Sequence, residues 1–216
     1  MPITSHYGWS ELAGRYIDLE TGRFVSFAKI RNVLESVMDA SAVRMNILSQ
    51  QLVDGSISIA NWQVAMKQQI KIIHVNAGMA ANGGFAQMSQ SDWGAVGQMI
   101  RAQYGYLDKF AQQIANGEQA LDGRLLVRSD MYGDAARGTF EQMERRLQIT
   151  NGFEEERRVL EDKLNNCDGC LEQAALNWQP IGTLDPIGAE ECTVRCRCEF
   201  EYRRVGENGE WEESEE

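Results

Sequence analysis

The sequence predicts a mainly α-helical protein: an antiparallel helical bundle followed by a small cysteine-rich, zinc-knuckle-like α+β module. Two observations predict this fold class. Apolar residues recur three and four positions apart through most of residues 26–152, which is the spacing of one buried helix face. All five cysteines of the 216-residue chain lie between residues 167 and 198, so a separate stapled unit is expected there.

Residues 1–25 are interpreted as an N-terminal arm, because no helical period is visible in them. The arm carries aromatic residues that no predicted helix buries. Two interpretations stay open: an arm that docks on a partner, or a strand or coil folded back on the bundle. The aromatic residues concerned are Tyr7, Trp9, Tyr16 and Phe24.

Residues 26–152 are expected to form four helices. Serine or aspartate precedes the apolar periodic segments, as N-caps do, and glycine follows them, as helix stops do. Short connections make consecutive helices antiparallel neighbours, so an up-and-down bundle is the simplest arrangement. The expected bounds are Ser26 to Gly55, Ser58 to Gly83, Ser91 to Gly117, and about 122–150 with Gly152 as the stop.

The bundle offers little chemistry. His6 and His74 are the only histidines, and neither stands at the E-x-x-H spacing of a dimetal site. His74 lies beside the apolar face of its helix and is expected to be a hydrogen-bonded or half-exposed helix histidine. The sequence has no nucleophile-elbow, P-loop, dinucleotide-binding or EF-hand motif, so no enzyme is expected. It also has no run of about 18 apolar residues, so no membrane partner is expected.

Residues 153–205 are interpreted as the cysteine-rich module. A C-x2-C pair is followed, after 21 residues, by a C-x3-C-x-C group, and such short knuckles can enclose a tetrahedral Zn2+. Sites closed by thiolates alone are structural, so a structural zinc ion bound by four of the five cysteines is expected. The candidate ligands are Cys167, Cys170, Cys192, Cys196 and Cys198.

Other uses of the cysteines stay open. Free cysteines packed as small hydrophobes would be scattered along the chain, whereas residues 1–166 contain none. Two disulfides would leave one thiol over. The first 25 residues contain acidic side chains and no apolar stretch typical of a secretory signal, and a chain made in a reducing cytosol favours metal over bridges.

The spacing also predicts local geometry in the module. A tight turn is expected at residues 167–170, with backbone N–H groups pointing at sulfur. Residues 192–202 are expected to form a strand, in which Cys196 and Cys198 face the same side. Cys192 then competes with one of these two for the last ligand position.

The charge of the chain is concentrated at its C-terminal end. The net charge is -11, and residues 153–216 contain 18 acidic residues against 7 basic ones, so the rest of the chain is balanced. Because phosphate contacts need clustered Lys and Arg, no sequence-specific nucleic-acid partner is expected. Residues 206–216 are rich in glutamate and are interpreted as an acidic disordered tail.

Several segments carry a family resemblance. They are Y-I-D-L-E-T-G-R-F-V at residues 16–25 leading into a long helix, N-C-D-G-C-L from Asn166, G-T-L-D-P-I-G from Gly182, and C-R-C from Cys196. With these, the chain resembles minor head proteins of tailed bacteriophages, and residues 160–200 are similar to the Mu F-like head morphogenesis family. Those proteins typically close with C-x2-C, a Gly/Pro-rich loop and H-x-x-C-R-C. Here Cys192 stands near the place of that histidine, one residue out of register.

The resemblance implies a structural virion protein, assembled in the host cytoplasm. As a minor head or head morphogenesis protein it would associate with the portal or the capsid, in a homo-oligomeric ring of many copies. One alternative is a head-to-tail connector or adaptor below the portal, since a helical adaptor would need the same bundle. The alternative from another class is a cytosolic zinc-containing module that binds proteins.

Overall fold

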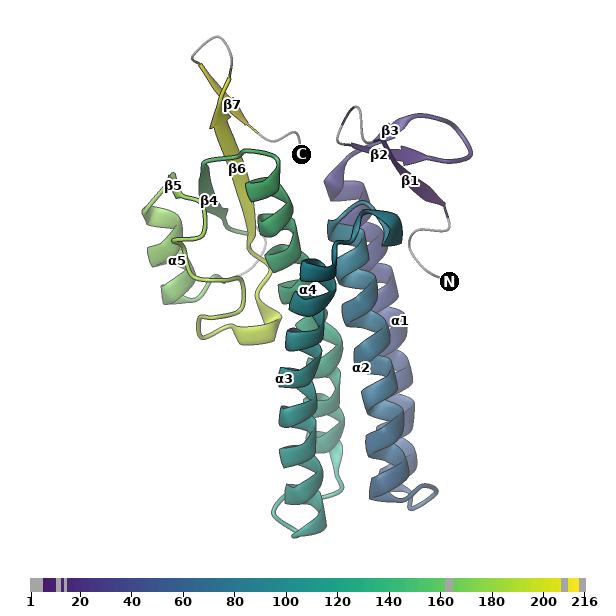
Figure 1. The fold of residues 1–216 in the computed structure, drawn as a ribbon. Helices are drawn as coiled ribbons and strands as arrows, with labels where there is room; N and C mark the ends of the chain where they lie inside the picture. The colour runs from purple at the N-terminus through teal and green to yellow at the C-terminus, as the bar shows by residue number, and fades with distance from the viewer. Residues whose placement is uncertain (1–5, 11–12, 14, 162–164, 207–209, 214–216) are drawn as a thin grey trace.

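The computed structural model describes residues 6–10, 13, 15–161, 165–206 and 210–213. This part of the chain is mainly α-helical, with five α-helices and two small antiparallel sheets. Four long helices lie side by side, and both sheets lie toward the same end of them (Figure 1). The helices are α1 (Phe27–Val53), α2 (Ile59–Ala81), α3 (Gln90–Ala115), α4 (Gly123–Thr150) and the short α5 (Asp168–Ala175).

Each long helix begins at a side chain that caps its first turn. The predicted starts at Ser26, Ser58 and residue 122 are confirmed, because each side chain accepts a backbone N–H of the first turn. The third helix starts earlier than predicted. Ser89 Oγ accepts the N–H of Asp92 at 3.2 Å, and the Asp92 carboxylate accepts the N–H of Ser89 at 3.0 Å, so these two residues form a capping box.

The apolar faces of the four long helices meet in one core. α2 packs against α1, α3 and α4, and α1 also packs against α4. Trp62 of α2 is fully buried, with its ring edge-on to Phe110 of α3. The Trp62 indole N–H donates to Ser49 at 3.0 Å, and the Ser49 hydroxyl donates to Ser129 at 2.7 Å. The buried polar groups of Trp62, Ser49 and Ser129 are therefore hydrogen-bonded to one another.

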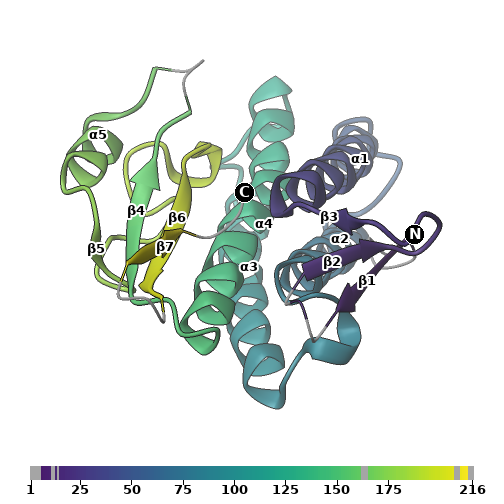
Figure 2. The same cartoon turned by 90° about the horizontal axis from the view of Figure 1, so that it is seen from above.

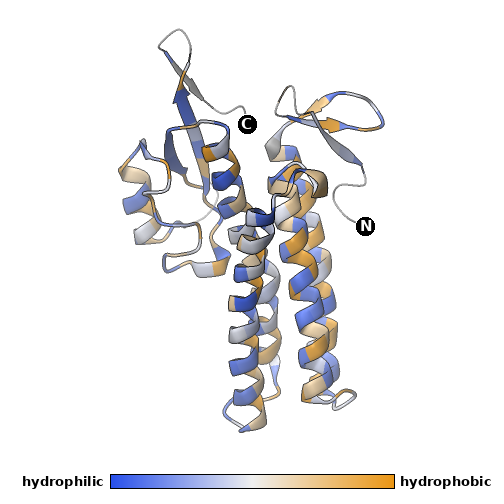
Figure 3. Ribbon diagram, in the orientation of Figure 1, coloured by the Kyte–Doolittle hydropathy of each residue, from blue (hydrophilic) through white to orange (hydrophobic). Residues whose placement is uncertain are grey.

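The distribution of hydrophobic and hydrophilic residues along the elements agrees with this packing. Hydrophobic and hydrophilic residues alternate along the four long helices, whereas β6 is mostly hydrophilic (Figure 3). Exposed apolar side chains also occur on the helices, including Val43 and Ile47 one turn apart on α1, which are 60% and 54% exposed. Within the described residues, no helix combines the length and apolar character needed to cross a membrane.

The N-terminal segment forms a sheet that packs on the C-terminal end of α2 (Figure 2). Buried Tyr16 donates its hydroxyl hydrogen to the carbonyl of Ala80 and accepts the N–H of Gly83 at 2.9 Å. Gly83 has φ +80°, and a Cβ there would lie 2.4 Å from the Trp9 ring, so only glycine fits. Of the two interpretations of the arm, the structure shows the folded-back strand. The strands are β1 (Tyr7–Ser10), β2 (Arg15–Asp18) and β3 (Phe24–Val25), in the order β1-β2-β3.

A second sheet lies beside α4, in the C-terminal part of the chain (Figure 2). The expectation of disorder over residues 206–216 is wrong for residues 211–213, which form a strand paired with the preceding one; residues 207–209 and 214–216 lie outside the described part. Backbone pairing here outweighs the acidic composition. The strands are β4 (Glu155–Val159), β5 (Gln179–Pro180), β6 (Glu199–Val205) and β7 (Trp211–Glu213), in the order β5-β4-β6-β7.

Candidate metal centre

The first cysteine pair lies at the start of a helix. Cys167 is the N-cap residue of α5, and Cys170 is buried in the first turn of that helix. The expected tight turn at residues 167–170 is therefore replaced by a helical turn, closed by the N–H of Leu171 donating to the carbonyl of Cys167 at 3.0 Å. Residues three apart on a helix lie on one face, which brings the two thiols together.

The second cysteine group lies on a turn followed by a strand. The expected strand over residues 192–202 is wrong for its first half, because residues 193–195 form a 3-10 turn and β6 begins at Glu199. Thr193 has φ +49° and its N–H donates to the carbonyl of Glu190 at 2.9 Å, so the chain reverses there. Cys196 and Cys198 are both 3% exposed, and their sulfurs face one side without a strand, because both lie within 4.8 Å of each other and of Cys170 Sγ.

The five sulfur atoms lie in two groups of three, and Cys170 belongs to both groups. Its Sγ lies 3.6 Å from Cys192 Sγ and 3.7 Å from Cys196 Sγ. The thiols of residues 167, 170 and 192 lie within 4.8 Å of one another, as do those of residues 170, 196 and 198. A tetrahedral zinc ion with Zn–S bonds of about 2.3 Å separates its sulfurs by about 3.8 Å. The clustered cysteines could therefore hold a metal ion.

This geometry identifies one of the four sulfurs that would bind an ion. Because both groups contain Cys170, an ion placed where the groups overlap has this sulfur as a ligand. All five cysteines are free thiols in the structure, so none is bridged to another. The sequence predicted that Cys192 competes with Cys196 or Cys198 for the last ligand position. In the structure, all four cysteines around Cys170 are candidates for the three remaining positions.

Electrostatics distinguish the thiols. A hydrogen bond from the Cys198 thiol, more than any other contact, lowers the pKa of Cys196 to about 4. Burial raises the pKa of Cys170, and burial followed by hydrogen bonding to Cys196 raises that of Cys192. One thiolate is thus stabilised by its neighbours' S–H groups. A cation would replace those protons, since the thiolate is the form that binds metal.

Groups around the sulfurs are suited to negative charge. Arg158 of β4 is 3% exposed and donates to Cys170 Sγ at 3.3 Å and to the carbonyl of Asp185. Zn2+ with four thiolates would keep two negative charges, and the buried guanidinium would offset one of them. The expectation that backbone N–H groups at residues 167–170 point at sulfur is wrong for Gly169, whose N–H donates to the Glu191 carboxylate at 3.2 Å, so an acidic group also lies beside the first cysteine pair. Sequence reasoning did not find Arg158, because nothing in the E-E-R-R-V strand relates it to a cysteine 12 residues later.

A buried charge cluster attaches the cysteine-rich part to the helices. Arg31 of α1 lies 3.3 Å from Glu141 and 3.1 Å from Glu144 of α4, and it also pairs with Glu199 of β6. Burial raises the pKa of Glu141 to about 8, although Arg31 acts in the opposite direction. Removal of Arg31 would leave the buried carboxylate of Glu144 without its counter-charge, which is strongly destabilising. No sequence pattern indicated this cluster, because Arg31 lies more than 100 positions before Glu141 and Glu199.

The two histidines do not join the metal centre. His74 is 1% exposed in α2 and its Nδ1 lies 2.6 Å from Thr139 Oγ1 of α4. Burial lowers its pKa to about 4, so it is neutral at pH 7. His6 is exposed beside the N-terminal sheet. The expectation of a hydrogen-bonded or half-exposed helix histidine is met only at Nδ1, because the side chain is buried and its Nε2 has no hydrogen-bond partner among the described residues.

The arrangement defines a sulfur-rich cluster that could hold a metal ion, with no neighbouring histidine among the described residues. No family model, curated protein or solved structure matches this chain.

Proposed function

We propose that the cysteine cluster binds one structural Zn2+ through Cys170 and three of the other four cysteines. Two groups of three sulfurs that share Cys170, with sulfur–sulfur distances of 3.6 and 3.7 Å at that residue, carry this proposal, because these distances match those of a tetrahedral zinc site. With the ion, residues 153–205 form a zinc-stapled module, and the four long helices form an antiparallel bundle to which the module is attached by the cluster around Arg31.

The zinc proposal is tested by metal analysis of the protein purified under reducing conditions. One zinc per chain, released by a chelator, is expected. Protein that carries no metal after growth with added zinc, or that shows two disulfides without reductant, would overturn it.

We further propose that the protein is a structural component of a tailed-phage virion, a minor head protein that contacts the portal or the capsid. Two features support this. The cysteine centre is built from residues 166–198, the stretch with the resemblance to the Mu F-like head morphogenesis family. The helical layer also presents apolar side chains such as Val43 and Ile47 to solvent, which suits subunit contacts. No enzymatic role is proposed.

Mass spectrometry of purified particles tests this role. The protein is expected in the particles, and cross-links from exposed helix residues to portal or capsid subunits are expected in intact heads. Cross-links to tail-side subunits alone would instead favour a head-to-tail connector. Absence from particles, with the protein remaining soluble in infected cells, would reject both and favour a cytosolic zinc-containing protein-binding module.

A further inference from the structure

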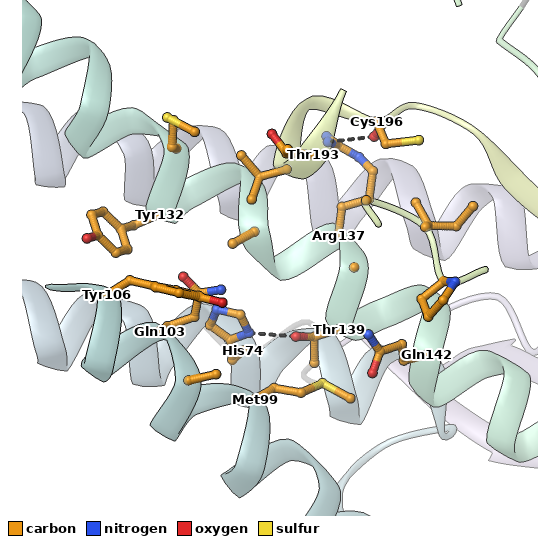
Figure 4. Close-up of a pocket in the computed structure, with 18 of the residues that line it drawn as sticks. His74, Met99, Gln103, Tyr106, Tyr132, Arg137, Thr139, Gln142, Thr193 and Cys196 are labelled. Atoms are coloured by element: carbon orange, nitrogen blue, oxygen red, sulfur yellow. Dashed lines mark hydrogen bonds between the residues drawn. The ribbon is translucent and has the colours of Figure 1, made fainter. Parts of the chain in front are cut away.

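A cavity of about 670 Å³ lies between the helices and the cysteine-rich part (Figure 4). Its walls come from α2, α3 and α4 and from the segment 186–196. This volume is within the range of small-molecule sites. Apolar side chains dominate the wall, and two methionines, Met99 and Met131, make it adaptable in shape. Ala102 and Tyr106, both exposed, lie at its rim.

One wall residue has an unused polar atom. His74 is 1% exposed, and its Nδ1 is occupied by Thr139, as the dashed line in Figure 4 shows. Within the described residues, its Nε2 is buried and has no hydrogen-bond partner. A buried polar group left unpaired destabilises the fold, so an occupant with a hydroxyl or carbonyl group would be stabilised there.

The charge of the wall is opposite to that of the chain. Two arginines line the cavity, and no aspartate or glutamate of the described residues does so, although the chain carries a net charge of -11. Arg137 is occupied by Glu35, whose carboxylate takes two of its N–H groups. Arg128 stacks on Phe110 at 4.0 Å and donates to Gln113, and it has no carboxylate partner in the described part of the chain.

Arg128 and His74, the two polar groups available to an occupant, lie at different positions along the axis of α4. Arg128 and Thr139, the partner of His74, are 11 positions apart on α4, which corresponds to about 16 Å along the helix axis. An elongated occupant is therefore needed to reach both. The space between them is lined on α4 by Met131, Tyr132 and Ala135.

We propose that this cavity binds an elongated amphipathic carboxylate, with its carboxylate on Arg128, an apolar body between α3 and α4, and a hydroxyl or carbonyl group on His74 Nε2. The inference goes beyond the proposed virion role and does not depend on it. A guanidinium is the best side chain for a carboxylate, and the apolar wall excludes water from the body of the ligand.

The proposal is tested with ω-hydroxydecanoate as the probe, compared with decanoate and decanol, by calorimetry and histidine ring ¹⁵N NMR. The chain has only two histidines, so exposed His6 serves as the reference for His74. One-to-one binding in the order ω-hydroxydecanoate, decanoate, decanol is expected, with a shift of the His74 Nε2 signal. Equal affinity for decanol and decanoate, or an unchanged His74 signal on saturation, would overturn the assignment.

Variants separate this site from non-specific binding. Arg128→Gln is expected to weaken decanoate binding about tenfold and to leave decanol unaffected. Ala102→Trp, at an exposed position of the rim, is expected to block all three probes. Ala115→Trp, exposed on the same helix and outside the wall, is the matched control and is expected to bind like the parent protein. Binding unaffected by Ala102→Trp would refute the proposal.

Discussion

Replacing Cys170 by serine tests the metal centre at the residue on which both sulfur groups depend. Cys170 Sγ lies 3.6 and 3.7 Å from two other sulfurs and belongs to both groups of three. Serine keeps the size of the side chain but replaces the thiolate, a strong zinc ligand, with a hydroxyl. Every four-cysteine site at the shared position loses a ligand in this variant.

The magnitude follows from linkage between metal binding and folding. With free zinc at about 1,000 times the dissociation constant, binding stabilises the folded module by about 4 kcal/mol. Removal of the ion withdraws this contribution from a segment whose own core contains few large apolar side chains. Those with exposure of 5% or less are Leu184, Ile187, Phe200 and Tyr202, beside three cysteines. The module is therefore expected to open while the long helices, which have a separate core, remain folded.

Native mass spectrometry and limited proteolysis read out the two effects. The parent protein is expected to carry one zinc and to resist cleavage between residues 153 and 205. Cys170→Ser is expected to be metal-free and to be cleaved there, with nearly unchanged helical circular dichroism.

The other four single serine variants provide the control. Five cysteines compete for four positions, so at least one of these variants is expected to retain a full equivalent of zinc. If Cys170→Ser kept its zinc and its protection, or if all five variants lost the metal equally, the shared-sulfur geometry would be wrong.

Three further predictions concern folding. Because burial raises the pKa of Glu141 from 4.5 to about 8, the folded state binds its proton more tightly; this residue's contribution to stability is full below pH 4.5 and is lost as pH rises through 8. Urea unfolding from pH 5 to pH 8 should show a smaller decline for Glu141→Gln than for the parent. Ser89→Ala should lower the free energy of unfolding by about 1 kcal/mol in urea titrations, because the helix loses its N-cap. Ser91→Ala should lower it by less; an equal or larger loss would mean that Ser91 caps the helix. Tyr16→Phe leaves the Gly83 N–H without its acceptor and should cost about 1–3 kcal/mol, measured by thermal unfolding; an unchanged melting temperature would contradict the role of this hydroxyl.

The helices could be predicted from sequence because their signals are local. Ser26 and Ser58 lie at the starts of long periodic apolar segments, and both cap their helices as expected. The third helix shows the limit of this reasoning. Two serines near its start are equally good candidates by type, and only the reciprocal bonds of Ser89 with Asp92 decide between them.

The candidate site was predicted in its residues but not in its local geometry. Cysteine spacing identified the five sulfurs, whereas the turn at Thr193 depends on contacts that composition does not reveal. Long-range partners were beyond sequence reasoning for the same physical reason. Arg31 meets Glu141 and Glu199 only after α1, α4 and β6 have packed, and no spacing rule relates residues so far apart.

The sheet beside α4 has a consequence for how copies of this protein could assemble. In the described part of the chain its edge strands are short: β5 has two residues, one of them Pro180, which lacks an N–H, and β7 has three. Short edges with missing donors are poor templates for adding a strand from another chain. If copies of the chain associate, they would then meet through side chains on helix surfaces, a mode of contact that can be loosened and reformed without breaking a backbone ladder.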